Sequence, residues 1–290
     1  MWIKGYINTK LLPNFSYIKN VVFRNHRFSY RLIKGAGYKQ AKVSVVGMIR
    51  LRNESLILED TLDHLSNLVD GIVIYDDAST DDSVEIARKH NKVIEVVANK
   101  KWRASSREWE ETANRALLYK RAKKFSKQWL FYLDTDERFE GDIYDYLVNR
   151  CHKDVNGIKI SLFDAYITAK DKKDYTKGAE LYNFRKYFGI ERRDILMIWK
   201  TSIDAKFKKP DLREPQGISG TIETKFYCQH YGKALSIQHW EDTCNYYVKN
   251  FPKYSEKWAK RMGRAIHNES DFGTRLYPWE SVKVKAVKIN

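Results

Sequence analysis

The sequence predicts an α/β fold built on a mostly parallel sheet. Three observations carry this prediction: apolar runs alternate with helical periods from Val43 onward, acidic residues follow two of those runs, and shorter aromatic-rich runs take over after Gly157. Buried strands of a parallel sheet are nearly continuous apolar runs, and helices cross from one strand to the next. We therefore expect a doubly wound parallel half followed by a half with a more mixed sheet.

The elements of the parallel half follow one another in a regular order. The expected strands are "VSVVGMI" (43–49), "GIVIY" (71–75), "KVIEVV" (92–97) and "WLFYL" (129–133). Helical periods predict helices over 54–68, 82–90 and 105–124, with one more in "GDIYDYLVNR" (141–150). Asp82 is expected to cap the second helix, with Glu85 as its capping-box partner.

The second half of the chain carries shorter runs that favour antiparallel pairing. These runs are "GIKISLF" (157–163), "LYNFRKYF" (181–188) and "KFYCQHY" (225–231), and a helical, Trp- and Tyr-rich basic segment follows. We expect a basic N-terminal arm, a main domain in two halves and a helical basic tail, with the bounds 1–42, 43–240 (43–145 and 146–240) and 241–290.

Composition bounds the class of protein. The chain has 290 residues, of which 43% are hydrophobic and 31% charged, and it contains no apolar run of about 18 residues that could cross a bilayer. The first residues lack the apolar core and cleavage site of a secretory signal, so we expect a cytoplasmic protein. Its three cysteines have no CxxC spacing, which favours neither a disulfide framework nor a zinc site.

The formal charge of +16 is unevenly distributed. Residues 1–42 carry nine Lys or Arg and no acid, residues 245–290 carry ten against four, and the middle keeps thirty-four against thirty-three. The charges are therefore +9, +6 and +1. Basic ends on a near-neutral body suggest contact with an anionic partner, either a membrane surface or a nucleic acid.

Two acidic clusters stand at predicted strand ends. Asp76 and Asp77 follow "GIVIY", and Asp134 and Asp136 follow "WLFYL". Ligands of open parallel sheets bind beyond the carboxyl ends of the strands. Carboxylates there can accept from a ribose hydroxyl or a base N–H, and can hold Mg²⁺ or Mn²⁺ against a pyrophosphate. The clusters predict a nucleotide and a metal together.

These residues resemble a known family. "VVGMIRLRNES", "LDHLSNLVDGIVIYDDASTDDSVEIA", "ETANRALLYKRAK" and "QWLFYLDTDERF" occur in the order and spacing of the donor-binding half of family 2 glycosyltransferases. The resemblance covers about residues 43–145. It implies the GT-A fold, with a Rossmann-like mostly parallel sheet and a mixed acceptor-side half. It also implies an inverting transferase that uses a nucleotide diphosphate sugar and a divalent metal, Mn²⁺ or Mg²⁺.

The family's site residues map onto this sequence position by position. The resemblance implies that the substrate-binding residues are Asn53, Glu54, Asp76, Asp77, Arg115 and Asp134, and that Asn114 accompanies Arg115. Asp134 and Asp136 match the DxD motif, with Asp136 on the metal, and His230 resembles a late histidine that some relatives use as a further metal ligand. The structural alternatives are a turn for Asn53, a solvated helix face for Arg115 and a core histidine for His230.

Inversion requires a general base that removes the acceptor's proton. The candidates are Asp164, Glu214, Glu241 and Asp242. The segment "KKPDLREPQG" resembles the loop that carries a base glutamate in related enzymes, so Glu214 is favoured, with a surface ion pair as the alternative.

The expected partners follow from the same resemblance. The favoured donor is a UDP-sugar, and the acceptor is a glycan or a lipid-linked molecule, as in the synthesis of surface polysaccharide or lipopolysaccharide. Apolar residues recur at helical spacing among basic ones in the N-terminal arm, at Leu11, Phe15, Ile18 and Val22. Such a segment could lie on the anionic inner face of a membrane or pack on the domain.

Other classes remain open. A nucleic-acid-binding protein would explain the basic ends, but carboxylates in a binding cleft repel phosphate, so we expect no nucleic acid. A phosphoryl-transfer enzyme of the haloacid dehalogenase type also carries DxD after a strand, although "DTDERF" departs from its usual continuation. A transferase-like fold without catalysis is a further alternative.

Overall fold

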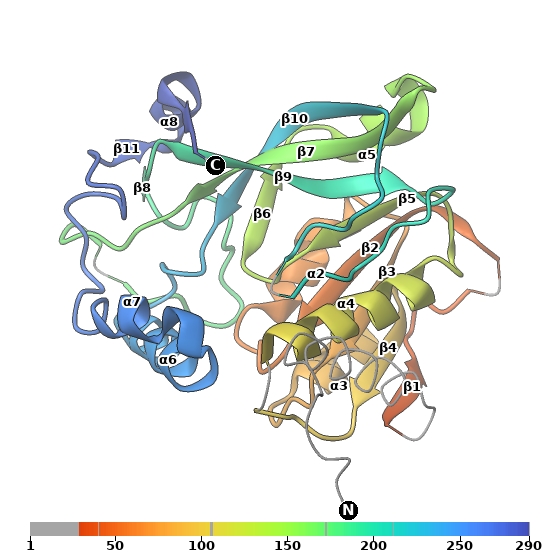
Figure 1. Ribbon diagram of the computed structural model, residues 1–290, viewed down its shortest axis with the longest axis horizontal. Helices are drawn as coiled ribbons and strands as arrows, with labels where there is room; N and C mark the ends of the chain where they lie inside the picture. Colours follow the sequence, from red (N-terminus) through yellow and green to blue (C-terminus); the bar gives the residue numbers. More distant parts are fainter. Residues whose placement is uncertain (1–28, 40, 105–106, 172, 211, 290) are drawn as a thin grey trace, which may run out of the picture.

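The computed structural model describes residues 29–39, 41–104, 107–171, 173–210 and 212–289. One large mixed sheet runs through the molecule in the order β1-β4-β3-β2-β5-β9-β7-β10-β6, and helices lie against it (Figure 1). The structure confirms the predicted α/β fold with a mostly parallel first half. The predicted N-terminal amphipathic segment lies outside the described residues.

The first half contains β1 to β5 and the helices between them. Their bounds are β1 Tyr30–Lys34, β2 Val43–Leu51, α2 Leu58–Ser66, β3 Gly71–Asp76, α3 Ser83–Lys89, β4 Val93–Asn99, α4 Arg107–Ala122 and β5 Ser126–Leu133. β2 pairs in parallel with β3 and β5, and β3 pairs in parallel with β4. β1 adds an antiparallel edge to β4. α2 and α3 are shorter than the ranges predicted for them, because the residues at their ends lie in turns and loops.

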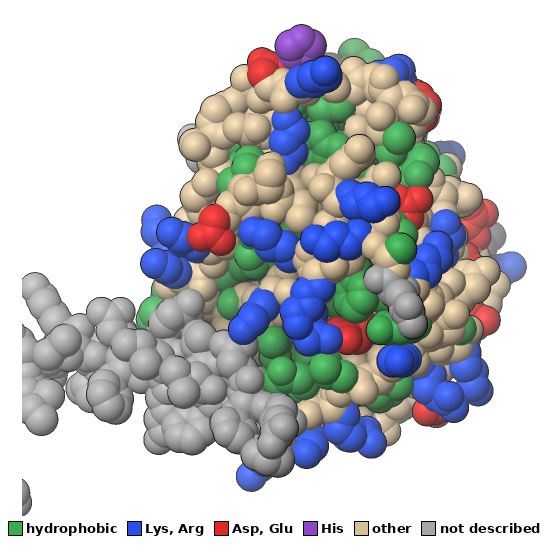
Figure 2. All heavy atoms as spheres, turned by 90° about the vertical axis from the view of Figure 1, so that its right-hand side faces the viewer, with side chains coloured by type: hydrophobic (Ala, Val, Ile, Leu, Met, Phe, Trp, Pro, Cys, Tyr) green, Lys and Arg blue, Asp and Glu red, His purple; other side chains and the backbone are tan. Residues whose placement is uncertain are grey.

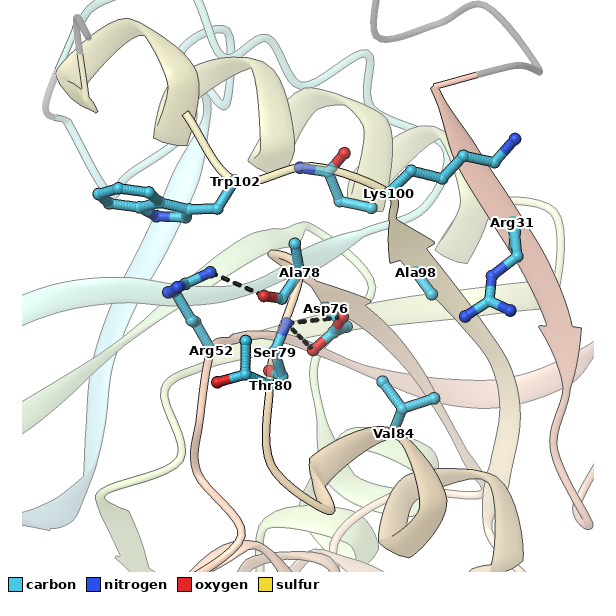
Figure 3. Close-up of a pocket in the computed structure, with 11 residues that line it drawn as sticks. Arg31, Arg52, Asp76, Ala78, Ser79, Thr80, Val84, Ala98, Lys100 and Trp102 are labelled. Atoms are coloured by element: carbon cyan, nitrogen blue, oxygen red, sulfur yellow. Dashed lines mark hydrogen bonds between the residues drawn. The ribbon is translucent and has the colours of Figure 1, made fainter. Parts of the chain in front are cut away.

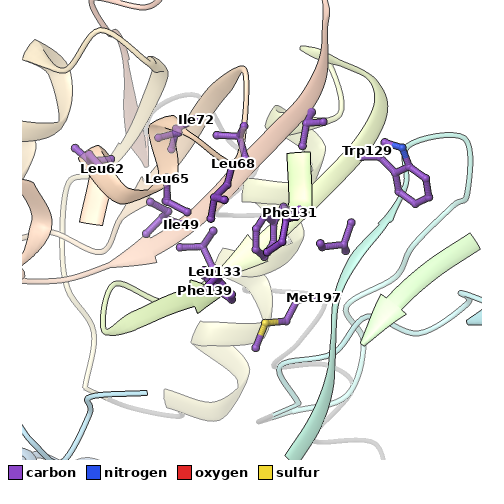
Figure 4. Packing of buried hydrophobic residues seen from close by; sticks show 14 of the residues in the cluster. Ile49, Leu62, Leu65, Leu68, Ile72, Trp129, Phe131, Leu133, Phe139 and Met197 are labelled. Atoms are coloured by element: carbon purple, nitrogen blue, oxygen red, sulfur yellow. The ribbon is translucent and has the colours of Figure 1, made fainter. Parts of the chain in front are cut away.

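Each face of the parallel half is buried by a different helix. Leu58, Leu62 and Leu65 of α2 pack in a cluster with Ile49 and Ile72 (Figure 4). On the other face, α4 contributes a stripe of apolar side chains that packs on β2, β3 and β5 in a second cluster. Because both faces are covered, the strands have almost no polar positions, which is why they were visible in the sequence as apolar runs.

The second half continues the sheet across β5. Its elements are β6 Glu137–Glu140, α5 Ile143–Asp145, the π-helical turn Tyr146–Arg150, β7 Val155–Asp164, β8 Tyr187–Phe188, β9 Glu191–Lys200 and β10 Thr221–His230. β9 pairs antiparallel with both β5 and β7, and β6 pairs antiparallel with β10.

Two expectations for the second half were wrong, and one strand was missed. β7 and β10 run parallel rather than antiparallel, because β6 and β9 supply the reversals on either side. The run 181–188 forms a strand only at β8, and β9 was not predicted. β9 begins with the charged residues "ERRD" and becomes apolar only from Ile195, so it shows no continuous strand pattern.

The C-terminal region folds back onto the second half. It contains α6 Ile237–Asn250, the short 3-10 turn Pro252–Tyr254, α7 Ser255–Ala259, β11 Tyr277–Pro278, α8 Trp279–Lys285 and β12 Val287–Lys288. α6 begins before the expected boundary at residue 241. Trp279 and Val282 of α8 share a buried cluster with Phe163 of β7 and Phe188 of β8.

Surface charge is uneven over the body as well. Lys and Arg side chains predominate on the face turned to the viewer in Figure 2, which corresponds to the right-hand side of Figure 1. None of the helices in the described ranges is long and apolar enough to cross a membrane.

Candidate functional site

The acids at the end of β3 have different surroundings. The carboxylate of Asp77 is fully buried, lies 2.6 Å from Arg107 Nη2 and accepts from Asn99 Nδ2 at 3.0 Å. Asp76 accepts long hydrogen bonds, 3.2 to 3.3 Å, from the backbone N–H of Ser79. Burial raises the pKa of Asp76 above its ordinary value, and the nearby carboxylate of Asp77 adds to the rise. Asp77 is thus held by the protein, whereas Asp76 faces a pocket.

That pocket opens at the carboxyl ends of β3 and β4. Its volume is about 460 Å³, and Figure 3 shows the side chains that line it. The lining residues are Arg31, Arg52, Asp76, Ala78, Ser79, Thr80, Val84, Ala98, Asn99, Lys100 and Trp102. Its place beyond the strand ends is where ligands of open α/β sheets bind.

The loop after β2 holds the loop after β3. Asn53 has a left-handed φ of 54°, which asparagine tolerates better than most residues. Its Oδ1 accepts from Thr80 N at 2.8 Å, and its backbone N–H donates to Ser79 Oγ at 2.9 Å. Asn53 therefore shapes the rim of the pocket. Whether it also touches a ligand stays a prediction.

The prediction that the side chain of Asp82 caps α3 is wrong. Asp82 occupies the N-cap position of α3, but its carboxylate makes no capping hydrogen bond. The carboxylate of Asp81 accepts from the backbone at the start of α3 instead. Its Oδ1 accepts from Ser83 N and its Oδ2 from Ser55 N, each at 3.0 Å. Glu85 pairs with Arg88 on the helix surface.

The acids at the end of β5 are tied to the second half of the chain. The side chain of Glu137 is fully buried and accepts hydrogen bonds from both terminal nitrogens of Arg213. The distances are 2.5 Å for Nη1–Oε1 and 2.7 Å for Nη2–Oε2. Arg213 Nη1 also lies 3.3 Å from Asp134 Oδ2, and Asp134 remains about one-third exposed. The carboxylate of Asp134 is therefore oriented by a cation and still reachable from solvent.

Asp136, His230 and Asp164 form a row. His230 Nε2 lies 3.4 Å from Asp136 Oδ2, and His230 Nδ1 lies 2.6 Å from Asp164 Oδ1. Burial opposes the charge of His230, but the two flanking carboxylates outweigh it and raise its pKa to about 10. Burial would raise the pKa of Asp136, but the His230 charge lowers it to about 2. The structure brings together the two residues predicted to bind a metal.

The Asp136 and His230 pair can hold a divalent cation when the metal displaces the proton of His230 Nε2. Both side chains keep about one-fifth of their surface exposed; Asp136 lies in the turn between β5 and β6, and His230 is the last residue of β10. A Cβ added to Gly232 would lie 2.7 Å from Asp136 Oδ2 and 3.0 Å from His230 Nε2, so glycine keeps space open beside both ligand atoms. Asp164 on Nδ1 is the outer partner that metal-bound histidines usually have. No cluster of three His, Cys, Asp or Glu ligands occurs within the described ranges, so further ligands would come from substrate or water.

Buried guanidinium groups surround Asp134. Among the described residues, three of their nitrogens are buried without a hydrogen-bond partner: Arg50 Nε, Arg115 Nη1 and Arg213 Nε. Burial alone would lower the pKa of each arginine, but the surrounding acidic groups, Asp134 among them, raise it above the ordinary value. The site therefore combines fixed cations with carboxylates, as a bound diphosphate with its metal requires.

Arg115 does not lie on a solvated helix face. Its side chain is 8% exposed, and it donates from Nε to Tyr132 Oη at 3.1 Å and from Nη2 to Glu111 Oε2 at 3.3 Å. Asn114 beside it on α4 is also buried. The alternative that Arg115 lies on a solvated helix face is therefore wrong.

Glu54 lies close to the acids of β5. Burial raises the pKa of Glu54 to about 8, and the charge of Asp136 adds to that rise. Its backbone N–H donates to Ser83 Oγ at 2.9 Å. Burial therefore favours the protonated form of this carboxyl, which can donate a hydrogen bond to an oxygen of a ligand.

The four candidates for the general base have different partners. Asp164 contacts three cations: His230, Arg193 and Lys233, the last at 2.9 Å from its Oδ2. Glu214 is half-buried, and its Oε1 accepts from Leu196 N of β9 at 2.7 Å. Glu241 and Asp242 lie on α6, where Gly263 N and Gln238 Nε2 donate to them. Asp164 is a poor candidate for the base, because Lys233, Arg193 and His230 hold the pKa of its carboxyl well below the ordinary value in spite of its burial.

Two site residues were missed from the sequence. Arg50 is the residue before the last of β2 and lies 3.3 Å from Glu111, and Arg213 contacts Asp134 and Glu137, which follow β5. A cation at a strand end, as in "MIRLRNES", is the signal that could have revealed Arg50. Arg213 had no comparable signal, because its loop lies 76 residues beyond Glu137.

Comparison with known families and proteins identifies similar sequences. The description "Glycosyl transferase family 2" matches residues 48–205. Uncharacterized proteins of Mycobacterium bovis and Mycobacterium tuberculosis are each 35% identical over 101 residues, which cover 34% of this chain. The matched region spans 25% of the length of these relatives.

Two solved structures are similar in parts of their architecture. One is a mannosyltransferase of Pyrobaculum calidifontis in complex with GDP-Man and Mn²⁺, at 14% identity and a TM-score of 0.38, covering 87% of this chain and 73% of the other. The other is S. aureus TarS in complex with UDP, at 10% identity and a TM-score of 0.39, covering 76% and 70%.

Proposed function

The chain belongs to glycosyl transferase family 2, and from this premise we propose that it transfers a sugar from a nucleotide diphosphate sugar to a hydroxyl group, with inversion and metal assistance. The observation that supports this most directly is the arrangement at the end of β5. Partly exposed Asp134 and Asp136 stand there beside His230 and guanidinium groups with buried nitrogens. Such a set suits a metal-bound diphosphate, which needs carboxylate ligands and cations at once.

Each part of the site has a proposed task. Asp136 and His230 would hold the divalent metal, which when bound supplies positive charge to the leaving diphosphate. Asp134, oriented by Arg213, would face the same diphosphate region. Arg50 and Arg115 carry buried nitrogens that could donate to phosphate oxygens. Asp76 would accept from the nucleotide base in the pocket of Figure 3, while Asn53 and Asp77 keep its loops in place.

Glu214 is the proposed general base. Leu196 N–H fixes one carboxylate oxygen, Oε1, and thereby orients the group. In an inverting transfer this carboxylate would take the proton of the acceptor hydroxyl while that oxygen attacks the anomeric carbon. The bond from that carbon to the diphosphate breaks in the same step.

The acceptor and the location of the protein are broader proposals. A glycan or a lipid-linked acceptor of surface polysaccharide or lipopolysaccharide type would bind in the half formed by β6 to β10. A cytoplasmic enzyme with basic ends would meet a lipid-linked acceptor at an anionic membrane face.

The test uses substitutions in the carboxylates and one matched acid outside the site. We expect Asp136→Asn to lower the release of nucleoside diphosphate by about a thousandfold, because the metal loses a charged ligand. The same variant should bind Mn²⁺ more weakly in an EPR titration. Asp82→Asn is the control, since Asp82 lies near the same edge of the sheet and its side chain makes no capping bond.

The assay also distinguishes the roles. Glu214→Gln should lower kcat and leave nucleotide binding nearly unchanged, because a base acts only in the chemical step. NMR of the product of the native protein should show an anomeric configuration opposite to that of the donor. Full activity of Asp136→Asn, or a product with retained configuration, would contradict the proposed mechanism.

A further inference from the structure

A row of three residues crosses the sheet beneath the pocket of Figure 3. Asp76 of β3 pairs in register with Ala98 of β4, and Ala98 pairs in register with Arg31 of β1. Residues paired in register on neighbouring strands point to the same face of the sheet. Two strand spacings place the backbones of Asp76 and Arg31 roughly 10 Å apart. The small side chain of Ala98 lies between them and leaves an open slot.

The slot has charged ends and an apolar lining. In Figure 3, the carboxylate of Asp76 and the guanidinium of Arg31 point into the same hollow from opposite sides, with Ala98 and Val84 between them. Lys100 adds a second cation at the Arg31 side. No acidic residue in the described part of the chain forms an ion pair with Arg31. A flat, polar-edged group that is apolar on its faces matches this lining.

The other arginine that lines the pocket, Arg52, has a different task. Arg52 Nη1 donates to the backbone carbonyls of Asp77 at 2.8 Å and Ala78 at 2.7 Å, and its guanidinium lies 4.7 Å from the ring centre of Trp102. Arg52 is therefore occupied with holding the loop. The cationic side chains of the pocket that remain for a ligand are those of Arg31 and Lys100, and the buried indole N–H of Trp102 is a further donor without a hydrogen-bond partner among the residues that the structure describes.

We propose that this slot selects guanine as the base of the donor nucleotide, an inference that rests on the function proposed above. Guanine presents adjacent donors, N1–H and the N2 amino group, on one edge, and the adjacent acceptors O6 and N7 beside it. Asp76 accepts from the donor edge, and the guanidinium of Arg31 donates to O6 and N7. Arginine is the side chain that most often contacts this pair of acceptors.

The other bases fit the two ends less well. Adenine and cytosine place a ring nitrogen acceptor next to their amino group, which would face the carboxylate of Asp76 unfavourably. Uracil offers one N–H between two carbonyl oxygens, so the second oxygen of Asp76 would meet an acceptor. A single ring also spans less of the slot than two fused rings. The slot thus favours a GDP-sugar over the UDP-sugar expected from the sequence.

The test compares nucleotides on the full-length protein by titration calorimetry in the presence of Mn²⁺. We expect GDP to bind at least tenfold more tightly than UDP, CDP or ADP, and inosine diphosphate, which lacks the N2 amino group, to bind about tenfold more weakly than GDP. Arg31→Met should reduce GDP affinity by about tenfold and leave UDP affinity unchanged. Lys34→Met on the same strand is the control, because Lys34 does not line the pocket.

Each outcome decides a separate question. Tighter binding of UDP than of GDP would overturn the guanine assignment and leave the proposed glycosyl transfer intact. A preference for GDP that survives in both Arg31→Met and Arg31→Lys would overturn the role of Arg31. Failure of every nucleoside diphosphate to bind, with a native melting temperature, would instead count against the proposed function itself.

Discussion

The two acidic strand ends of the site differ in where their cations come from. After β3, the carboxylate of Asp77 is neutralised by Arg107, which lies 30 residues away in the same half. After β5, Glu137 and Asp134 are oriented by Arg213, and Asp136 by His230, both from the second half of the chain. The first end is assembled locally, whereas the second exists only when both halves have folded together.

This difference matches two kinds of task. At the β3 end, the ion pair of Asp77 and Arg107 is fully buried. Of the two acids there, only Asp76 lines the pocket. The β5 end keeps Asp134 and Asp136 partly exposed, with side-chain exposures of 34% and 22%. Exposed carboxylates can exchange partners when a ligand arrives, which a fully buried pair cannot do without a large desolvation cost.

The largest expected effect is on stability at the β3 end. Arg107→Met removes the guanidinium that pairs with the buried carboxylate of Asp77, so we expect the free energy of unfolding to fall by about 3 to 5 kcal/mol. Arg213→Met should cost less, because the Arg213 side chain is 18% exposed and water can reach the vacated place. Urea unfolding followed by circular dichroism measures both.

Two controls accompany that comparison. Asp77→Asn combined with Arg107→Met should recover part of the loss, since the unpaired charge is gone. Arg88→Met, which removes an exposed pair with Glu85, should leave the unfolding curve unchanged. A greater loss in Arg213→Met than in Arg107→Met would show that the β5 end, not the β3 end, is the rigid one.

The second prediction concerns Asp164, which orients His230 from the far side. Asp164→Asn keeps an acceptor for Nδ1–H but removes the negative charge, so Mn²⁺ affinity should fall by about 10- to 100-fold. An EPR titration on protein with a native circular dichroism spectrum measures this, and Asp242→Asn on the exposed side of α6 is the control. Unchanged Mn²⁺ affinity would mean that the contact at 2.6 Å only holds the strands together.

The smallest expected effect tests how β6 is fastened beside the β5 end. Phe139 N of β6 donates to His64 Nε2 of α2 at 2.8 Å, and burial, helped by the charge of Arg138, lowers the pKa of His64 to about 4. An unfolded histidine has a pKa near 6.5, so this contribution is complete above that pH and is lost as pH falls toward 4.

The corresponding substitution is His64→Gln, whose amide oxygen can accept from Phe139 N without titrating. Between pH 6 and pH 4.5 the native protein should lose roughly 1 kcal/mol of stability per pH unit more than this variant. Thermal melts across that range measure the difference. Parallel pH profiles for the two proteins would show that His64 does not couple β6 to pH.

The parallel half and its acidic edge were predictable from the sequence. The strands from Val43 to Leu133 appear as apolar runs because both of their faces are buried, and Asp76 and Asp134 follow directly where two of those runs end. The second half was less predictable. β9 carries charged residues in its first half, and the parallel pairing of β7 with β10 depends on β9 and β6, which flank this pair in the sheet.

The sequence by itself determined that acids stand at two strand ends, because strand periodicity and the order of residues along the chain are local properties. Only the tertiary structure decided which cation meets which acid, since the partners Arg213 and His230 lie far along the chain and other Arg and His residues could have served from sequence alone. It also decided that Arg31, in a segment expected to be a basic arm, stands across Ala98 from Asp76. Charge pairing acts at a few ångströms in space, and sequence separation carries no information about that distance.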